Sequence, residues 1–404
     1  MARNIVLCMD GTWNKPGQKD QGKETETNVL KLYEALADRP AQIGKYFPGV
    51  GTDPGEKVSG GAFGWGLFDQ IKDGYRFLRE NFAPGDRIYI FGFSRGAYSA
   101  RSLAGMILRC GVIRKDVEDV KIPGLVADLV TTQQDGNLKV DVTDKAFAMY
   151  KHGYEEENRE DVAQFKREYC NDATVRLVGV WDTVGALGIP DEFFIPALRK
   201  IDKAIDANLY GFLDTDLSPR VEAAYHAVAI DEQRKPFLPT LWTDARGAAP
   251  RVNAAGSNVE QVWFVGAHSN VGGGYADSGL SDIALKWMIA RASSTGLQFE
   301  EAALAALRPD PKAKRRDSLE EFVEIGNEKR NRFFAWIDKV ATRFMGINRA
   351  IPAGACIHSS VAERLAAPAV GEPQSEAAYG PAPTLKLATR DGVRTVDPQF
   401  RLVS

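Results

Sequence analysis

Short runs of apolar residues, separated by longer amphipathic stretches, limit the folds that this chain can adopt. Nearly every position in each run is apolar, which is the pattern of a strand with both faces covered. Such strands are typical of parallel sheets packed between two layers of helices. The runs with this pattern cover residues 5–9, 88–93, 175–180 and 262–265. The sequence therefore predicts a buried, mostly parallel sheet.

Helical periodicity fills the stretches between these runs. Residues 28–36 and 68–82 repeat apolar side chains along one helix face. A third helical pattern begins at Ser281, which together with Asp282 is an expected N-cap. Strands that alternate with helices in this way predict a doubly wound α/β fold.

Two stretches depart from the alternation of strands and helices. Residues from about 112 to 172 are polar with a helical pattern, and residues from about 300 to 350 form a second helical stretch. The 404 residues are enough for one large domain with insertions. We predict a single domain over residues 1–360 with insertions at these two places. The tail over residues 361–404, rich in Ala, Pro and Glu, is expected to pack on the surface or to be partly flexible.

The charge and the metal-binding residue types exclude some classes of function. The formal net charge is −3, from 51 Lys and Arg against 54 Asp and Glu, so the balance does not point to nucleic acid. The four cysteines are spread along the chain without a CxxC or Cys/His cluster. We therefore expect no metal site and no cofactor.

The hydropathy pattern gives a limited indication of where the protein acts. No stretch approaches the roughly 18 apolar residues of a membrane helix, and the run at residues 5–9 is too short for a signal sequence. We expect a cytoplasmic protein without a transmembrane segment. Peripheral membrane contact and export by a route that reads no N-terminal signal are both compatible with the sequence, and the oligomeric state is not indicated.

The run Gly92-Phe93-Ser94-Arg95-Gly96 matches the G-x-S-x-G pattern in the context that the pattern requires. A strand pattern leads directly into Ser94, and a helix pattern with small residues in its first turn follows it. In a nucleophile elbow the serine lies on a strained turn, and glycines on both sides avoid collisions. We predict an α/β-hydrolase fold with Ser94 as the nucleophile.

A serine nucleophile needs a base, and the chain offers few histidines for this role. His268 comes just after an apolar run and before a glycine-rich loop, at the edge of the sheet where such folds keep their sites. His226 is the main rival. Its segment has the pattern of a helix or a buried segment, which favours a core histidine and leaves a substrate-facing role as the alternative. His152 is expected to be exposed, and no clear strand precedes His358.

The acid that orients the base should also follow a strand. Asp182 ends the run that starts at Val175, and Thr183 and Gly185 follow it in a loop. Asp191 and Asp277 are weaker candidates, because neither has this placement at a strand end. A turn or helix-capping carboxylate is the alternative role for Asp182.

The oxyanion hole needs two backbone N–H donors. Arg95, the residue after the serine, is expected to supply one. Gly11 and Thr12, in the loop after the first apolar run, are the candidates for the other. Asp10 either holds this loop or contacts substrate.

The assembled motifs resemble the DUF2235 family of α/β hydrolases, which includes the Tle1-like phospholipase effectors of type VI secretion. The motifs follow one another in the expected order and span about residues 1–290. They are residues 9–14, 47–52, 92–101, 181–185, 226–234 and 266–275.

This resemblance implies a triad of Ser94, Asp182 and His268, and hydrolysis of carboxylic esters, with phospholipids as substrates in the effector members. The expected partner is therefore an ester or lipid substrate. Two other functions are compatible with the sequence: a hydrolase of small esters, thioesters or amides with the same triad, and a non-catalytic binding protein with a vestigial site.

Overall fold

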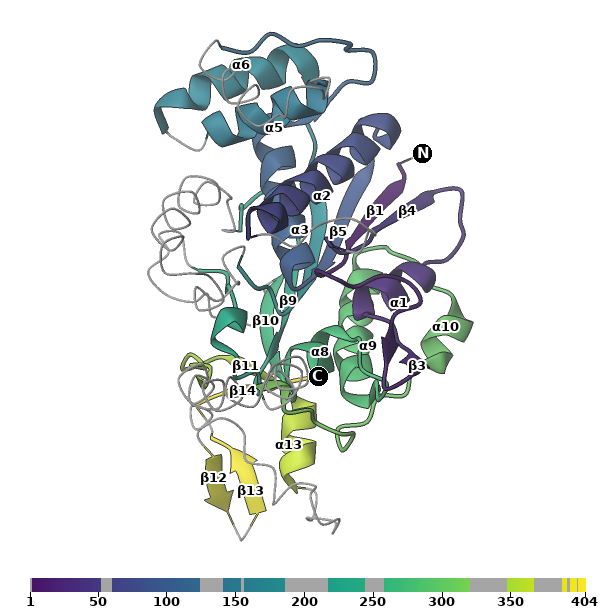
Figure 1. The fold of residues 1–404 in the computed structure, drawn as a ribbon, viewed down its shortest axis with the longest axis vertical. Helices are drawn as coiled ribbons and strands as arrows, with labels where there is room; N and C mark the ends of the chain where they lie inside the picture. Colours follow the sequence, from purple (N-terminus) through teal and green to yellow (C-terminus); the bar gives the residue numbers. More distant parts are fainter. Residues whose placement is uncertain are drawn as a thin grey trace, which may run out of the picture.

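The predicted strands lie in one eight-stranded sheet, shown by the computed structural model in Figure 1. The structure describes residues 2–51, 60–123, 141–153, 156–185, 217–243, 258–319, 347–366, 387–390, 393–397 and 399–404. Every described pairing within this sheet is parallel, which confirms the α/β prediction. In spatial order the strands are β14 (Arg401–Val403), β11 (Cys356–His358), β10 (Val259–Phe264), β9 (Ala224–Ala229), β8 (Val175–Trp181), β5 (Arg87–Phe93), β1 (Asn4–Met9) and β4 (Gln42–Phe47).

Helices cover both faces of the sheet, and each face has its own hydrophobic core. Helices α2 (Gly60–Asn81) and α3 (Arg95–Cys110) pack on one face. Helices α1 (Asn28–Glu34) and α9 (Gly279–Ser294) pack on the other (Figure 1). The strands are buried on both sides, which explains why they are apolar at nearly every position.

The strand order reverses its direction between β1 and β5. From β1 the chain moves to β4 through α1 on one face, and from β5 it moves away from β1 through α3 on the other face. Open α/β sheets bind ligands at the carboxyl ends of the strands at such a reversal of strand order. Ser94 and the Asp10 loop both lie at this point.

The predicted insertions pack beyond the two helical layers or are only partly described. Helices α5 (Val142–His152) and α6 (Arg159–Tyr169) stack on α2 and α3, as Figure 1 shows. Of the second insertion, the structure describes residues 300–319, including α10 (Glu301–Ala306), and residues 347–350. After it come β11 and α13 (Ser359–Ala366), and β14 joins the sheet as its edge strand. The division into one domain with a tail stays a prediction.

Several local predictions differ from the structure. His152, expected to be exposed, is buried, with its Nε2 2.8 Å from Oδ2 of Asp161. His358, for which no strand was expected, is the last residue of β11. Helix α9 begins at Gly279 and not at Ser281, so Ser281 lies inside the helix. The segment around His226 is not a helix but the buried strand β9, which pairs in parallel with β8 and β10. The expected glycine loop after His268 begins as a short helix, α8 (His268–Gly272), and turns at Gly273 and Gly274 through positive φ values.

No described helix is long and apolar enough to cross a membrane.

Several small elements complete the described structure. The small elements are the strand pairs β2 (Lys19–Asp20) with β3 (Lys23–Glu24), β6 (Val112–Ile113) with β7 (Cys170–Asn171), and β12 (Leu387–Arg390) with β13 (Val393–Val396), and the 3-10 helices η1 (Glu156–Asn158) and η3 (Lys235–Phe237).

The centre of the sheet should dominate the stability of the domain. Ile90 in β5 is fully buried, between Leu7 and Val178 on the neighbouring strands. We expect Ile90→Ala to lower the free energy of unfolding by about 2–5 kcal/mol in urea titrations, because it leaves a cavity. Leu402→Ala on the edge strand is the control, since Leu402 is 52% exposed, and it should change stability by less than about 0.5 kcal/mol. Equal losses in both variants would contradict this account.

Candidate active site

Ser94 lies on a sharp turn between β5 and α3, with φ 57° and ψ −123°. This conformation is costly for a residue with a side chain, so the surroundings must impose it. A Cβ atom on Gly92 would lie 2.4 Å from the carbonyl oxygen of Gly96, and one on Gly96 would lie 2.3 Å from that of Met9. The turn therefore admits only glycine at both positions, as expected for a nucleophile elbow.

The structure brings Asp182 and His268 into direct contact. Nδ1 of His268 lies 2.5 Å from Oδ2 of Asp182, and both side chains are buried. Asp182 follows β8 and His268 begins α8 just beyond β10, so the ends of the parallel strands bring residues far apart in sequence to one edge. The N–H of Ser94 donates to the carbonyl of Trp181, the residue before Asp182.

The ring of His268 is packed between aromatic side chains on two sides. Its centroid lies 4.5 Å from that of Phe93, the residue before Ser94, and 5.0 Å from that of Phe237. Burial lowers the pKa of His268 below its usual value, although the hydrogen bond to Asp182 acts in the opposite direction. The imidazole is therefore held neutral next to the elbow, in the state that accepts a proton.

Asp182 is bound by a buried guanidinium that sequence reasoning missed. Arg349 donates from Nη1 to Oδ1 of Asp182 over 2.6 Å and from Nη2 to Oδ2 over 2.9 Å. The N–H of Ala229 also donates to Oδ1. Burial alone would raise the pKa of Asp182, but the charge of Arg349 and the hydrogen bond from His268 hold it well below its usual range. The carboxylate stays ionised.

The loop after β1 lies against the serine. A Cβ atom on Gly11 would lie 2.9 Å from Cβ of Ser94, so glycine is required for this approach. The N–H of Gly11 donates to its neighbour Asp10 over 2.7 Å, whereas the N–H of Thr12 makes no hydrogen bond within the described residues. Thr12 is therefore the stronger of the two candidates for an oxyanion donor. Arg95 begins α3, where N–H groups point out of the helix end.

The sequence matches the family described as the catalytic domain of T6SS phospholipase effectors of the Tle1-like type, over residues 3–291. The chain belongs to this family. The matched segment includes the elbow, Asp182 and His268, but it ends before Arg349.

Individual relatives resemble parts of this Tle1-like domain. The uncharacterized protein YEL023C of Saccharomyces cerevisiae is 31% identical over 261 residues, which is 60% of this chain and 33% of that protein. The chain therefore spans about a third of this curated relative. An uncharacterized protein from Pseudomonas aeruginosa aligns with a TM-score of 0.44 and 19% identity, over 77% of this chain and 49% of its own. The Tle1 effector bound to the VgrG spike of the type 6 secretion system aligns with a TM-score of 0.36 and 18% identity, over 69% of this chain and 53% of its own.

In this Tle1-like domain Asp10 holds the loop after β1. Its side chain is 1% exposed, and its carboxylate accepts hydrogen bonds from the N–H of Gly11 and from the hydroxyls of Thr27 and Tyr46, over 2.6–2.7 Å. Of the two roles expected for Asp10, this geometry matches the structural one. Burial raises the pKa of Asp10 to about 6, although the hydrogen bonds act against the increase.

Of the two roles expected for His226, the geometry matches that of a core histidine. It is fully buried in β9, and its Nε2 accepts the N–H of Thr183 over 3.1 Å while its Nδ1 contacts Gln261. Burial lowers the pKa of His226 to about 3, so the ring stays neutral. His226 therefore fixes the turn that follows Asp182, which is a structural role.

Glu232 is a second residue that sequence reasoning did not assign. Its carboxylate accepts the N–H of His268 over 3.2 Å, the hydroxyl of Ser318, and hydrogen bonds from the Arg234 guanidinium. Burial would raise the pKa of Glu232, but Arg234 lowers it to about 2. The position of Glu232 beyond the apolar end of β9 was a signal that could have found it, because carboxylates at strand ends collect at this edge.

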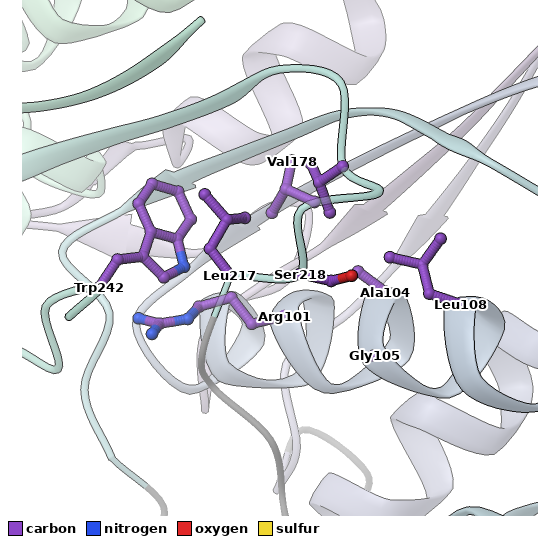
Figure 2. A pocket seen from close by; sticks show the side chains of 9 residues that line it. Arg101, Ala104, Gly105, Leu108, Val178, Leu217, Ser218 and Trp242 are labelled. Atoms are coloured by element: carbon purple, nitrogen blue, oxygen red, sulfur yellow. The ribbon is translucent and has the colours of Figure 1, made fainter. Parts of the chain in front are cut away.

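A small crevice opens between α3 and β8, away from the elbow. Figure 2 shows the Arg101 side chain beside the Trp242 ring, with Val178 of β8 above the helix. The residues that line this crevice do not include Ser94, Asp182 or His268. Two further apolar segments of the sequence, Phe193 to Ile195 and Phe333 to Met345, are candidates either for the core or for an acyl pocket, and they lie outside the described residues.

The raised pKa of Asp10 predicts a pH-dependent stability. A folded-state pKa of about 6 against 3.8 in the unfolded chain means that the stabilising contribution is present below pH 3.8 and is lost as pH rises through 6. We expect the unfolding free energy of the wild type, minus that of Asp10→Asn, to fall by about 2–3 kcal/mol between pH 4 and 7. Chemical denaturation of both proteins across this range measures it. The other titrating groups are the same in both proteins, so their contributions cancel in this difference. A difference in unfolding free energy that does not change between pH 4 and 7 would contradict the argument that burial raises the pKa of Asp10.

Proposed function

We propose that this domain hydrolyses a carboxylic ester of a lipid through an acyl-enzyme on Ser94. The proposal depends above all on the buried contact between His268 and Asp182, next to the turn that carries Ser94. A strained serine, a neutral imidazole and an ionised carboxylate at one sheet edge are the parts of a nucleophile with its base and orienting acid. The family of the chain supports the same chemistry.

The first half of the reaction forms the acyl-enzyme. Nδ1–H of His268 donates to Asp182, which leaves Nε2 to take the proton of the Ser94 hydroxyl as its oxygen attacks the carbonyl carbon. The N–H groups of Arg95 and Thr12 would hold the negative charge that develops on the carbonyl oxygen. His268 then gives its proton to the alcohol oxygen, the ester bond breaks, and the alcohol leaves.

The second half releases the acid. Water gives a proton to Nε2 of His268 and attacks the acyl carbon, the bond to the Ser94 oxygen breaks, and the serine recovers its proton from the imidazole. Each step moves one proton between oxygen and Nε2, and none of them changes a redox state. The residues named here are sufficient for the cycle.

The lipid part of the proposal comes from the family, because phospholipase effectors give the family its description. A related reaction on small soluble esters would use the same residues. Chain-length preference separates the two substrates, since a lipase needs a long acyl chain for binding.

A fluorophosphonate probe should label the wild type on Ser94. We expect Ser94→Ala to abolish labelling and to lower ester hydrolysis by at least about 1,000-fold, because the nucleophile is lost. Ser99→Ala is the matched control, since Ser99 is a fully buried serine of the same helix, and it should label like the wild type. Folded wild-type protein that takes up no probe would contradict the hydrolase proposal and favour a non-catalytic binding protein.

Phospholipid vesicles test the substrate class. The wild type should release fatty acid from vesicles of phosphatidylethanolamine and phosphatidylglycerol, and Ser94→Ala should not, because only an acyl-enzyme can form the product. Fatty acid is measured by mass spectrometry. Cleavage of short-chain nitrophenyl esters with intact vesicles would overturn the lipid part of the proposal and leave the ester chemistry standing.

A further inference from the structure

Two carboxylates and two guanidiniums surround His268 in the interior of the protein. Asp182 pairs with Arg349, and Glu232 pairs with Arg234 over 2.8 Å. The side chains of the two carboxylates are fully buried, that of Arg349 is 1% exposed and that of Arg234 is 16% exposed. Because each negative charge has its own positive partner, the site is electrically balanced while the imidazole is neutral.

Protonation of His268 would add an unbalanced positive charge to this site. The titratable groups that lie close to the ring are Asp182, Glu232 and Arg234, and Arg349 lies beyond Asp182. His226, whose Nε2 accepts the N–H of Thr183 next to Asp182, is kept neutral by its burial, which lowers its pKa to about 3. Within the described residues, therefore, Arg349 cancels the charge of the carboxylate that would otherwise stabilise an imidazolium.

Hydrogen bonds to backbone carbonyls as well as to Asp182 hold the guanidinium of Arg349 in place. Besides both oxygens of Asp182, Arg349 donates to the carbonyl of Ala229 over 2.7 Å and to that of Phe237. Ala229 ends β9, and its own N–H donates back to Oδ1 of Asp182. A planar guanidinium with parallel donors fixes the plane of a carboxylate, which a lysine cannot do. The plane in turn directs Oδ2 at Nδ1 of His268.

We propose that Arg349 is a positioning residue that sets the proton affinity of His268 and the orientation of Asp182. This inference rests on the proposed function, in which His268 is the base. Arg349 lies outside the segment that matches the family, so the C-terminal part of this chain completes the site. By weakening the attraction between Asp182 and an imidazolium, it keeps the base unprotonated at mildly acidic pH, at some loss of transition-state stabilisation.

The test measures the titration of His268 directly. The 15N signals of its imidazole, assigned by comparison with His268→Asn, are followed against pH in the wild type, Arg349→Met and Arg349→Lys. We expect the midpoint to rise by about one pH unit or more in Arg349→Met, because the charge of Asp182 is no longer cancelled. Arg349→Lys keeps the charge and should titrate near the wild type. Arg364→Met is the matched control, since Arg364 is also buried and donates to the carbonyls of Pro311 and Ala313.

The rate of ester hydrolysis gives the second measurement. The acid limb of kcat/KM on a soluble nitrophenyl ester should move to higher pH by the same amount in Arg349→Met. In Arg349→Lys the limb should stay in place while kcat falls by about 10-fold or more, because the carboxylate loses its bidentate support. If Arg349 had a purely structural role, its replacement would lower kcat/KM without shifting the acid limb of the pH profile.

A variant that fails to fold does not end the test. Arg349→Met leaves a buried carboxylate without its partner, so the effect of Arg349 is also measured in the Asp182→Asn background, where no such charge remains. There, removal of Arg349 should again raise the midpoint of His268, by less than in the wild-type background, because only the direct repulsion between the guanidinium and an imidazolium is removed. An unchanged midpoint in both backgrounds would overturn the inference.

The two proposals can fail separately. If the wild type hydrolyses esters but His268 titrates independently of Arg349, the positioning role is wrong and the hydrolase stands. If His268 responds to Arg349 but the wild type takes up no fluorophosphonate and cleaves no ester, the electrostatic coupling stands and the hydrolase proposal is wrong.

Discussion

The close approach of two backbones at the reversal of strand order is the constraint on which the site depends. The loop after β1 packs directly against the turn at Ser94, and it does so only because glycines remove side chains from the contact. A Cβ atom on Gly11 would reach Ser94, and one on Gly49 would lie 1.7 Å from the carbonyl oxygen of Gly11. Three segments of chain therefore meet without any side chain between them. This leaves backbone N–H groups of two loops near one serine, which is what an oxyanion hole requires.

The parallel sheet provides the rest of the arrangement through its register. Because β5 pairs with β8 and β8 with β9, the residues after these strands begin at nearly the same height. Asp182 thus starts beside Ser94, and its N–H is held by Ala227 of β9. His226, one residue earlier on β9, holds Thr183 from below. Strand β9, whose sequence indicated no more than a buried histidine, therefore holds the backbone of Asp182 and Thr183 in place.

Local patterns in the sequence predicted the features that depend on few residues. The apolar runs gave the strands, and the spacing of Gly92 and Gly96 gave the elbow, because sterics at a sharp turn act over a few positions. Asp182 and His268 were predictable because parallel strands end at a common edge. Arg349 was not, since it lies at the end of the second stretch with a helical sequence pattern and no periodicity marks its partner. Nor did any pattern show that Asp10 already occupies the N–H of Gly11, because that contact depends on the turn geometry of a single loop.

In the proposed mechanism, the charges around His268 couple the stability of this domain to its chemistry. A buried carboxylate such as Asp182 is costly to desolvate, and the guanidinium of Arg349 offsets that cost while it also reduces the benefit of protonating the imidazole. A stronger base would follow from a weaker partner for Asp182, but the folded state would then contain an uncompensated charge. The bidentate pair is a compromise between these two demands. The stability of the folded state and the proton affinity of His268 both depend on the two hydrogen bonds between Arg349 and Asp182. A substitution of Arg349 should therefore change both, which links a residue far along the chain to the proposed reactivity of Ser94.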